Sequence, residues 1–247
     1  MDILEQLARN LPDRAPRMSA ASPLSSAFHL QESPPDRRQT KAARSVARGS
    51  ARETVAKRGL DLGVALALLI VLAPLLTAIA LLIRFESSGP ALFRQRRLGL
   101  DGKPFRILKF RTMVVLEDGD LIRQAEPSDS RVTRVGRFLR AASLDELPQF
   151  VNVLKGEMSL VGPRPHAVVH DRLFGSLIRS YDLRRRVKPG ITGWAQINGL
   201  RGATPTLAAM RRRVAHDVWY ARNASLRLDL AILLRTPVEM LRRRNAF

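Results

Sequence analysis

The chain has 247 residues, with 42 lysines and arginines against 22 acidic residues, a formal net charge of +20, and no cysteine. The missing cysteines exclude disulfides and thiolate metal sites. The charge predicts anionic partners, either a membrane surface or phosphorylated substrates. Nucleic acid is not expected as a partner, because aromatic residues are few and no nucleic-acid-binding motif is present.

Three regions follow one another along the chain. Residues 1–56 are rich in proline, serine, alanine and arginine, which predicts a disordered basic tail. Residues 57–86 are predicted to form a membrane segment, and residues 87–247 a cytoplasmic catalytic domain.

The membrane segment contains an uncharged run from Leu62 to Ile83. At about 1.5 Å per residue, a helix of this length would just cross a bilayer. Ala73-Pro74 lies in the middle, however, and proline breaks a regular helix. Basic residues stand at positions 57 and 58 and again from Arg84, so both flanks favour the cytoplasmic side. The pattern predicts a re-entrant helix that breaks at Ala73-Pro74 and returns to the same face.

Residues 90–113 predict a β-hairpin, since two extended stretches flank Asp101-Gly102, a dipeptide suited to a tight turn. Nearly all of its charged residues are basic, including Lys109 and Arg111. A solvated strand face is the plain explanation, but a hairpin this basic beside a membrane segment is better explained by contact with lipid headgroups or a bound phosphate.

Residues 131–165 hold the densest pattern in the chain. Apolar residues at helical spacing with arginines beside them, Arg140 among these, predict a basic amphipathic helix in the membrane interface. Ser143 is expected to N-cap a second helix, with Glu146 completing a capping box.

The last third begins with a turn-rich stretch at 187–202, followed by helical patterns at 205–222 and 226–242. Pro237 is expected to kink or break the second of these helices. Together the elements predict a mainly helical α+β fold. A re-entrant membrane helix, a small β-hairpin and amphipathic interfacial helices would surround a cytoplasmic catalytic core.

Asp145 and Glu146 form the leading candidate site. Adjacent carboxylates can bind Mg²⁺ through oxygen, and one of them can attack phosphorus as a nucleophile. Acidic residues at a helix start also occur simply because they complement the helix dipole. The functional interpretation is favoured by basic residues that could gather around the pair and neutralise phosphate charge, namely Arg140, Arg164, Lys109 and Arg111.

Other residues leave alternatives open. Asp118 and Asp120 imitate the metal-binding pair of metal-dependent glycosyltransferases, which would release UDP rather than UMP. Gln196 stands in a rigid turn where its amide could bind a base or a sugar, and Asp217 is either a salt-bridge partner or a site residue. A non-catalytic membrane adaptor would explain the charge equally well, but not an acidic pair among arginines.

Six ordered motifs resemble the bacterial sugar transferase family, the monotopic phosphoglycosyl transferases: "FRQRRLG", "KPFRILKFRTM", "SRVTRVGRFLR", "SLDELPQFVNVLKGEMSLVGPRP", "VKPGITGWAQING" and "LDLAILLRT". The resemblance covers residues 57–247. Within the family, "GPRPHAV", "NGLRG" and "RRNAF" are most similar to undecaprenyl-phosphate glucose-1-phosphate transferases.

The resemblance implies a reaction and its site. A UDP-sugar, with UDP-glucose the first choice, would bind with Mg²⁺, and Asp145 would attack the β-phosphorus and release UMP. Undecaprenyl phosphate would then take the sugar phosphate, as the first step of exopolysaccharide synthesis. Glu146 would help to bind Mg²⁺, and Arg140 and Arg164 would lie near the phosphates.

The resemblance also implies a location, the inner face of the bacterial cytoplasmic membrane with its anionic lipids, and allows for a homodimer. Many glucose-type relatives carry several N-terminal transmembrane helices, where this chain has its basic tail. That difference leaves galactose or a modified N-acetylated sugar open as the group transferred.

Overall fold

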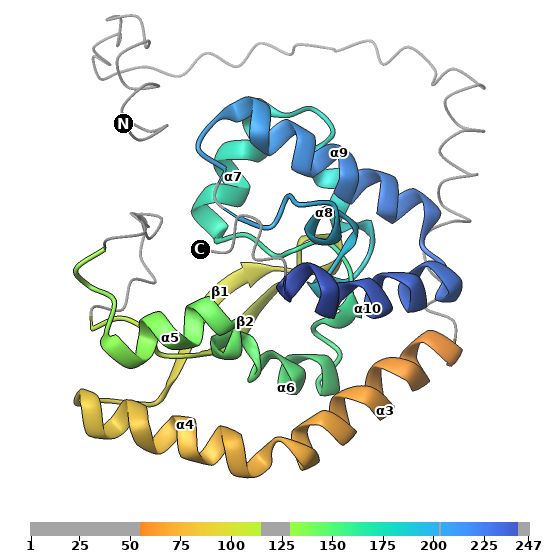
Figure 1. Ribbon diagram of the computed structural model, residues 1–247. Coiled ribbons are helices and arrows are strands. Elements are labelled where there is room, and N and C mark those ends of the chain that lie inside the picture. Colours follow the sequence, from red (N-terminus) through yellow and green to blue (C-terminus); the bar gives the residue numbers. More distant parts are fainter. Residues whose placement is uncertain (1–54, 115–128, 203, 242–247) are drawn as a thin grey trace, which may run out of the picture.

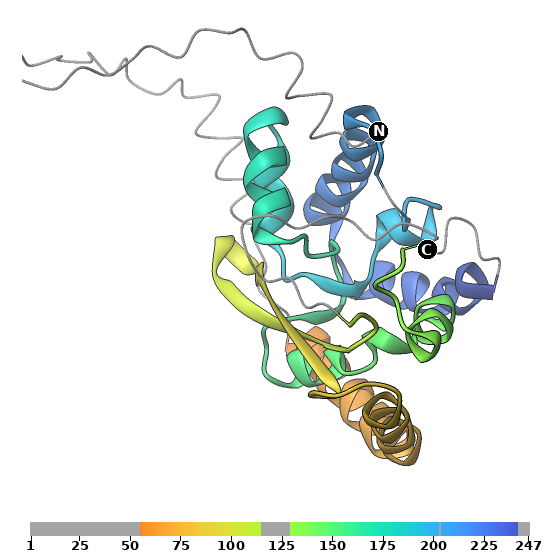
Figure 2. The same ribbon diagram turned by 90° about the vertical axis from the view of Figure 1, so that its left-hand side faces the viewer.

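The computed structural model describes residues 55–114, 129–202 and 204–241 (Figure 1). These residues are mainly helical, with two small two-stranded sheets, which confirms the predicted α+β, mainly α, class. The bent pair α3 (Val55–Val71) and α4 (Ala73–Glu86) forms one side of the molecule. Helices α7 (Val168–Leu177) and α9 (Leu207–Asn223) lie at the opposite side (Figure 2). Most of the predicted tail lies outside the described residues.

The helix break falls where the sequence predicts it. The axes of α3 and α4 differ by 62°. Pro74 lies in the first turn of α4, where a proline costs nothing because that backbone N–H has no intrahelical partner. The Thr77 hydroxyl donates to the Ala73 carbonyl at 2.9 Å. Within the described residues, no single helix is both long and apolar enough to cross a bilayer, whereas the bent pair taken together meets both criteria.

The start of α3 is fastened to the rest of the fold by charged side chains. Lys57 Nζ lies 2.5 Å from Asp229 Oδ2 on α10 (Leu226–Leu241). Arg58 donates to the carbonyls of Val153 and Leu154, at 2.8 and 3.0 Å, at the end of α6 (Gln149–Leu154). These contacts bind the first turn of the predicted membrane helix directly to α6 and α10.

Helix α3 has two different faces, although nearly all of it is apolar. Its inner face buries Asp61, which accepts a hydrogen bond from the Leu160 N–H at 3.0 Å, and Ala65. On the outer face, Leu66 and Ile70 remain exposed. One face is therefore packed on protein, and the other is available to an apolar environment.

The predicted β-hairpin is confirmed. Strands β1 (Leu92–Leu98) and β2 (Pro104–Phe110) pair antiparallel, from Leu92 opposite Phe110 to Leu98 opposite Pro104. The connection η1 (Leu100–Gly102) needs a positive φ at Asp101 and Gly102, as the dipeptide predicts.

Asn152 of α6 fixes the hairpin against the helix that follows the acidic pair. Its Oδ1 accepts from the Leu108 N–H at 2.9 Å, and its Nδ2 donates to the Arg106 carbonyl at 2.7 Å. Because strand side chains alternate between faces, this register sets the position of the neighbouring Lys109. The hairpin therefore delivers a cation to a fixed point beside α6.

A second, parallel pair joins β3 (Ser159–Val161) to β4 (Gly190–Thr192), and the sequence patterns did not indicate it. A Cβ at position 190 would overlap the backbone of Gly162, so the two segments approach each other through glycines.

The C-terminal helices α9 and α10 confirm the two predicted helical patterns. Pro237 lies inside α10 without ending it, so the expected break at this residue is wrong.

Candidate active site

The acidic pair lies on a short turn that the chain reaches through an unusual residue. Ser143 ends α5 (Arg134–Ala142) in the left-handed conformation, with φ of 58° and ψ of 21°. The chain then enters η2 (Leu144–Glu146), a single 3-10 turn. The predicted capping box is wrong, because Ser143 makes no side-chain cap and the Glu146 carboxylate is engaged by cations instead.

Glu146 is held by two basic side chains. Arg164 binds it in bidentate fashion, with Nη1 2.9 Å from Oε2 and Nη2 2.5 Å from Oε1, and Lys109 Nζ lies 2.8 Å from Oε1. Burial raises the pKa of Glu146, but these two cations outweigh it and lower that pKa well below its usual range. Glu146 is therefore a fixed carboxylate anion.

Asp145 has a different environment. Among the described residues, no side chain donates a hydrogen bond to its carboxylate. Burial and the neighbouring charge of Glu146 raise the pKa of Asp145 to about 6, against the opposing effect of Lys109 and Arg164. Its carboxylate is thus uncommitted and more basic than an exposed aspartate.

The pair faces a polar pocket of about 90 Å³ that contains four basic side chains. The sequence predicts that Arg140, Arg164 and Lys109 gather here, and the structure brings all three to this pocket. It adds Arg201, whose Nη2 donates to the Ser143 hydroxyl at 2.5 Å. Arg201 was missed, although a lone cation in a glycine-rich turn, "NGLRG", could have drawn attention to it.

Arg111 does not reach this pocket. It is buried, and its guanidinium donates to the Ser87 carbonyl at 2.6 Å, to the Ser87 hydroxyl at 3.0 Å and to the Ser88 carbonyl. These groups follow the C-terminal end of α4. Arg111 therefore joins the end of α4 to the hairpin, because both of its terminal nitrogens donate hydrogen bonds there.

Gln196 and Asp217 also lie outside the polar pocket. The Gln196 amide donates to the Ile191 carbonyl at 3.0 Å, and its side chain lines a neighbouring apolar pocket. Asp217 Oδ2 accepts from Arg184 Nε and Nη2, at 3.0 and 2.8 Å, and Arg184 Nη2 donates to the Arg164 carbonyl at 2.5 Å. Asp217 thus supports the backbone of Arg164 from behind the site.

The competing metal pair, Asp118 and Asp120, lies outside the described residues, so its position stays a prediction. Ala73 and Pro74 form the helix break already described and take no part in the pocket.

An uncommitted carboxylate, a second carboxylate held by cations and further basic side chains can together perform phosphoryl chemistry. The carboxylate can attack phosphorus, and the cations can neutralise the charge on the transferred group. The described geometry is therefore suited to a phosphorylated substrate.

Comparison with known proteins identifies the family. The bacterial sugar transferase family matches residues 52–243. The chain belongs to this family and is an enzyme, a sugar-phosphate transferase.

Individual relatives are similar over most of the chain. A UDP-glucose:undecaprenyl-phosphate glucose-1-phosphate transferase of Caulobacter vibrioides is 55% identical over 191 residues, covering 77% of this chain and 72% of that protein. A protein of the same name from Escherichia coli is 53% identical, over 73% of this chain and 39% of the relative. A UDP-N-acetylgalactosamine-undecaprenyl-phosphate N-acetylgalactosaminephosphotransferase of Aeromonas hydrophila is 43% identical, over 73% and 42%. The chain thus spans less than half of the two longer relatives.

Proposed function

We propose that the protein transfers a sugar 1-phosphate from a UDP-sugar, with UDP-glucose the first choice, to undecaprenyl phosphate, and releases UMP. The observation that carries this proposal is the acidic pair with opposite environments in one cation-lined pocket. The names of the relatives support the donor and the acceptor. The Aeromonas relative supports keeping an N-acetylated sugar as an alternative, and galactose also stays open.

In the proposed first step, an oxygen of Asp145 forms a bond to the β-phosphorus of the UDP-sugar. The bond between that phosphorus and the bridging oxygen breaks, and UMP leaves with the bonding electrons. In the second step, a phosphate oxygen of the acceptor attacks the same phosphorus and the aspartyl bond breaks. The uncommitted carboxylate of Asp145 supports this role, since Glu146 is already held by Arg164 and Lys109.

The basic side chains have a separate role in this proposal. A diphosphate that enters the pocket brings negative charge next to two carboxylates. Without nearby cations, the carboxylates would repel it. Lys109, Arg140, Arg164 and Arg201 all line the pocket and would offset that charge. Because Arg164 and Lys109 are held by Glu146, they are positioned before the substrate arrives.

Mg²⁺ fits the donor set of this site. Magnesium is usually bound through one or two carboxylates, with substrate phosphates and water completing its shell. Asp145 and Glu146 offer adjacent carboxylate oxygens, while the described residues contain no cluster of three or more acidic, histidine or cysteine side chains. We propose that these two residues hold Mg²⁺ together with the donor, and that the ion would neutralise charge on the diphosphate.

We propose that α3 and α4 enter one leaflet of the bacterial inner membrane and return to the cytoplasmic face, which makes the enzyme monotopic. The 62° bend, the exposed apolar side chains of the outer face and the fastening of α3 to the catalytic domain support this placement. Anionic lipids would meet the basic surface, and the product would begin exopolysaccharide synthesis. A homodimer stays a prediction.

The test uses the full-length protein in membranes or detergent, with radiolabelled UDP-glucose, UDP-galactose and UDP-N-acetylated sugars. We expect one donor to give UMP and a labelled lipid that depends on undecaprenyl phosphate. Asp145→Asn should reduce UMP release by at least about 10³-fold, the scale seen when a nucleophile is removed. Asp182→Asn, a change at a side chain that is 77% exposed, should leave the rate unchanged. Release of UDP instead of UMP, or full activity of Asp145→Asn, would contradict the proposal.

A further inference from the structure

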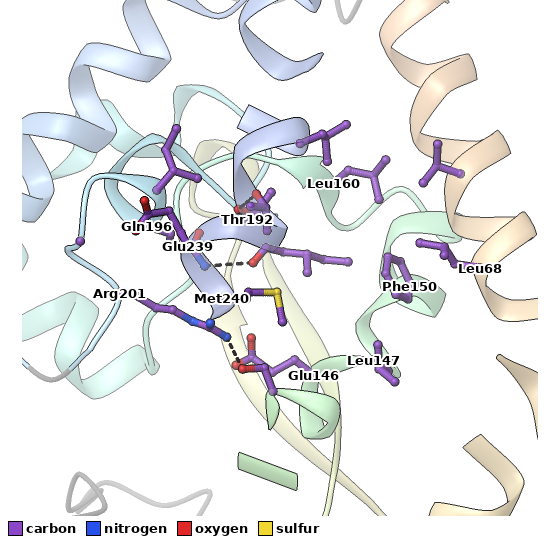
Figure 3. Close-up of a pocket in the computed structure, with 17 residues that line it drawn as sticks. Leu68, Glu146, Leu147, Phe150, Leu160, Thr192, Gln196, Arg201, Glu239 and Met240 are labelled. Atoms are coloured by element: carbon purple, nitrogen blue, oxygen red, sulfur yellow. Dashed lines mark hydrogen bonds between the residues drawn. The ribbon is translucent and has the colours of Figure 1, made fainter. Parts of the chain in front are cut away.

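A second and larger pocket adjoins the acidic pair (Figure 3). Its volume is about 210 Å³, and it shares Ser143, Glu146 and Arg201 with the polar pocket. The remaining walls are largely apolar and come from α3, α6, β4 and α10, including Val64, Leu68, Phe150, Ile191, Leu233 and Met240. A polar and an apolar compartment therefore meet at one carboxylate.

Several polar groups in the apolar walls are already hydrogen-bonded to one another or to the backbone, although the Gln196 Oε1 acceptor is buried without a hydrogen-bond partner. The hydroxyls of Thr192 and Thr236 are 2.8 Å apart, and the Gln196 amide donates to the Ile191 carbonyl at 3.0 Å. A pocket with few unused donors and acceptors is poorly suited to a nucleobase, which needs hydrogen bonds to be recognised. It suits a hydrocarbon, whose burial requires none.

Arg201 is shared by the two compartments, and its guanidinium reaches the acidic turn at Ser143 (Figure 3). Arginine suits phosphate oxygens because its planar donors match their geometry. A ligand with a phosphate at one end and a hydrocarbon chain at the other would match this arrangement. A cavity of about 150 Å³ holds a benzene molecule, so 210 Å³ has room for at least one five-carbon isoprene unit.

The position of the pocket agrees with a lipid occupant. It lies between α3 and α10, and both helices have exposed apolar side chains on other faces, Leu66 and Ile70 on α3 and Leu230 and Leu234 on α10. The same two helices that would touch the bilayer thus form the walls of the pocket. A lipid could enter from the membrane without leaving an apolar environment.

We propose that this apolar pocket receives the first isoprene units of the polyprenyl phosphate acceptor, while Arg201 holds the acceptor phosphate beside Asp145. The inference rests on the proposed function and adds where the acceptor binds and which part of it is recognised. The competing occupant is the uracil of the donor, and the test distinguishes the two.

The experiment fills the pocket from α10 in the full-length enzyme. Leu233→Trp puts a large ring into the pocket, and Leu234→Trp makes the same change at the next residue, which is 78% exposed. We expect Leu233→Trp to raise the KM for undecaprenyl phosphate at least about tenfold, with the KM for the UDP-sugar within about twofold of wild type. Leu234→Trp should leave both constants unchanged.

A chain-length series provides a second measurement. With acceptors of one, two and three isoprene units, kcat/KM of the wild type should rise with each added unit. In Leu233→Trp this increase should be lost. If Leu233→Trp unfolds in a thermal melt, Met240→Trp replaces it, because Met240 lines the same pocket and is 39% exposed.

Two outcomes would overturn the inference while leaving the proposed function intact. If Leu233→Trp raises only the KM for the UDP-sugar, the pocket binds the nucleotide. If it changes neither KM, the pocket binds neither substrate. The proposed function fails differently, because then the wild-type enzyme itself would release no UMP from any UDP-sugar.

Discussion

Asp145 and Glu146 are neighbours in sequence and have opposite electrostatic environments. Glu146 is clamped by Arg164 and Lys109, which keep it ionised, whereas Asp145 is buried next to that fixed negative charge. Two titratable groups whose pKa values are pushed apart commonly divide the chemistry between them. Under the proposed function, Glu146 would support the site and Asp145 would attack phosphorus.

The raised pKa of Asp145, about 6, predicts a pH dependence. A carboxylate attacks only in its ionised form, so kcat/KM for the UDP-sugar should be level above pH 7. It should fall about tenfold for each unit of pH below 6. The measurement is an initial-rate profile of UMP release from pH 5 to 9, with a thermal melt at each pH to show that the enzyme stays folded. A profile that stays level to pH 5 would contradict the assignment.

Ser143 has a positive φ, which costs a non-glycine residue roughly 1–2 kcal/mol. Ser143→Gly and Ser143→Ala both remove the hydroxyl that binds Arg201, but only glycine relieves the backbone. The glycine variant should therefore be more stable than the alanine variant by about 1 kcal/mol in denaturant unfolding. At Ser176, an exposed position in α7, the order of the two variants should be reversed, since glycine weakens a regular helix. If the alanine variant is the more stable one at both positions, the positive φ of Ser143 does not strain the backbone.

At the scale of elements, the predicted membrane helix is part of the catalytic fold. Arg58 binds the last carbonyls of α6, the helix that directly follows the acidic turn, and Lys57 pairs with Asp229 of α10. Cations at a helix C-terminus satisfy its free carbonyls and complement its dipole. The position of α3 is therefore coupled to that of the site.

Arg58→Met tests this coupling, because it keeps most of the side-chain stem and removes both hydrogen bonds. Loss of charge-assisted bonds should lower the free energy of unfolding by about 2 kcal/mol. Denaturant unfolding in detergent would measure it. Arg137→Met, at an exposed position of α5, serves as the control and should change stability by less than about 0.5 kcal/mol. Equal stability of the two variants would show that Arg58 does not fasten the helix.

The whole molecule combines a basic surface with an apolar layer. Arg94 of the hairpin and Arg134 and Arg137 of α5 are exposed, and the chain has a formal net charge of +20. The bent pair α3 and α4 offers exposed apolar side chains, such as Leu66 and Phe85. The basic residues are expected to strengthen binding to anionic lipid. Burial of the apolar side chains is expected to maintain binding when salt screens those charges.

This combination predicts two different effects of salt on vesicle binding. In flotation assays at about 0.1 M salt, anionic vesicles should bind more protein than neutral ones. At about 1 M salt that difference should vanish while binding itself persists, since the Debye length is then only about 3 Å. The double variant Leu66→Asp and Ile70→Asp should lose the vesicle binding that persists at high salt. Complete release of the unchanged protein by salt would contradict insertion of α3 and α4.

Local sequence signals determined much of the architecture. Pro74 fixed the helix break, because proline fits only the first turn of the helix that follows. Asp101-Gly102 fixed the hairpin, because its turn needs two residues with positive φ. Residue chemistry also pointed to Asp145 and Glu146, since a carboxylate pair with arginines nearby supplies the groups that phosphoryl chemistry uses.

Only the tertiary structure decided which charged side chains meet that pair. Arg111 and Lys109 are two residues apart on the hairpin, yet one fastens the end of α4 and the other binds Glu146. Arg201 reaches Ser143 from 58 positions away, and Asp217 acts through Arg184 behind the site. The sequence separation of the contacting residues explains why the turns were predictable and the partners of the charged side chains were not. Turns and helix breaks depend on the torsion angles of adjacent residues, whereas the partner of a charged side chain depends on packing between distant segments.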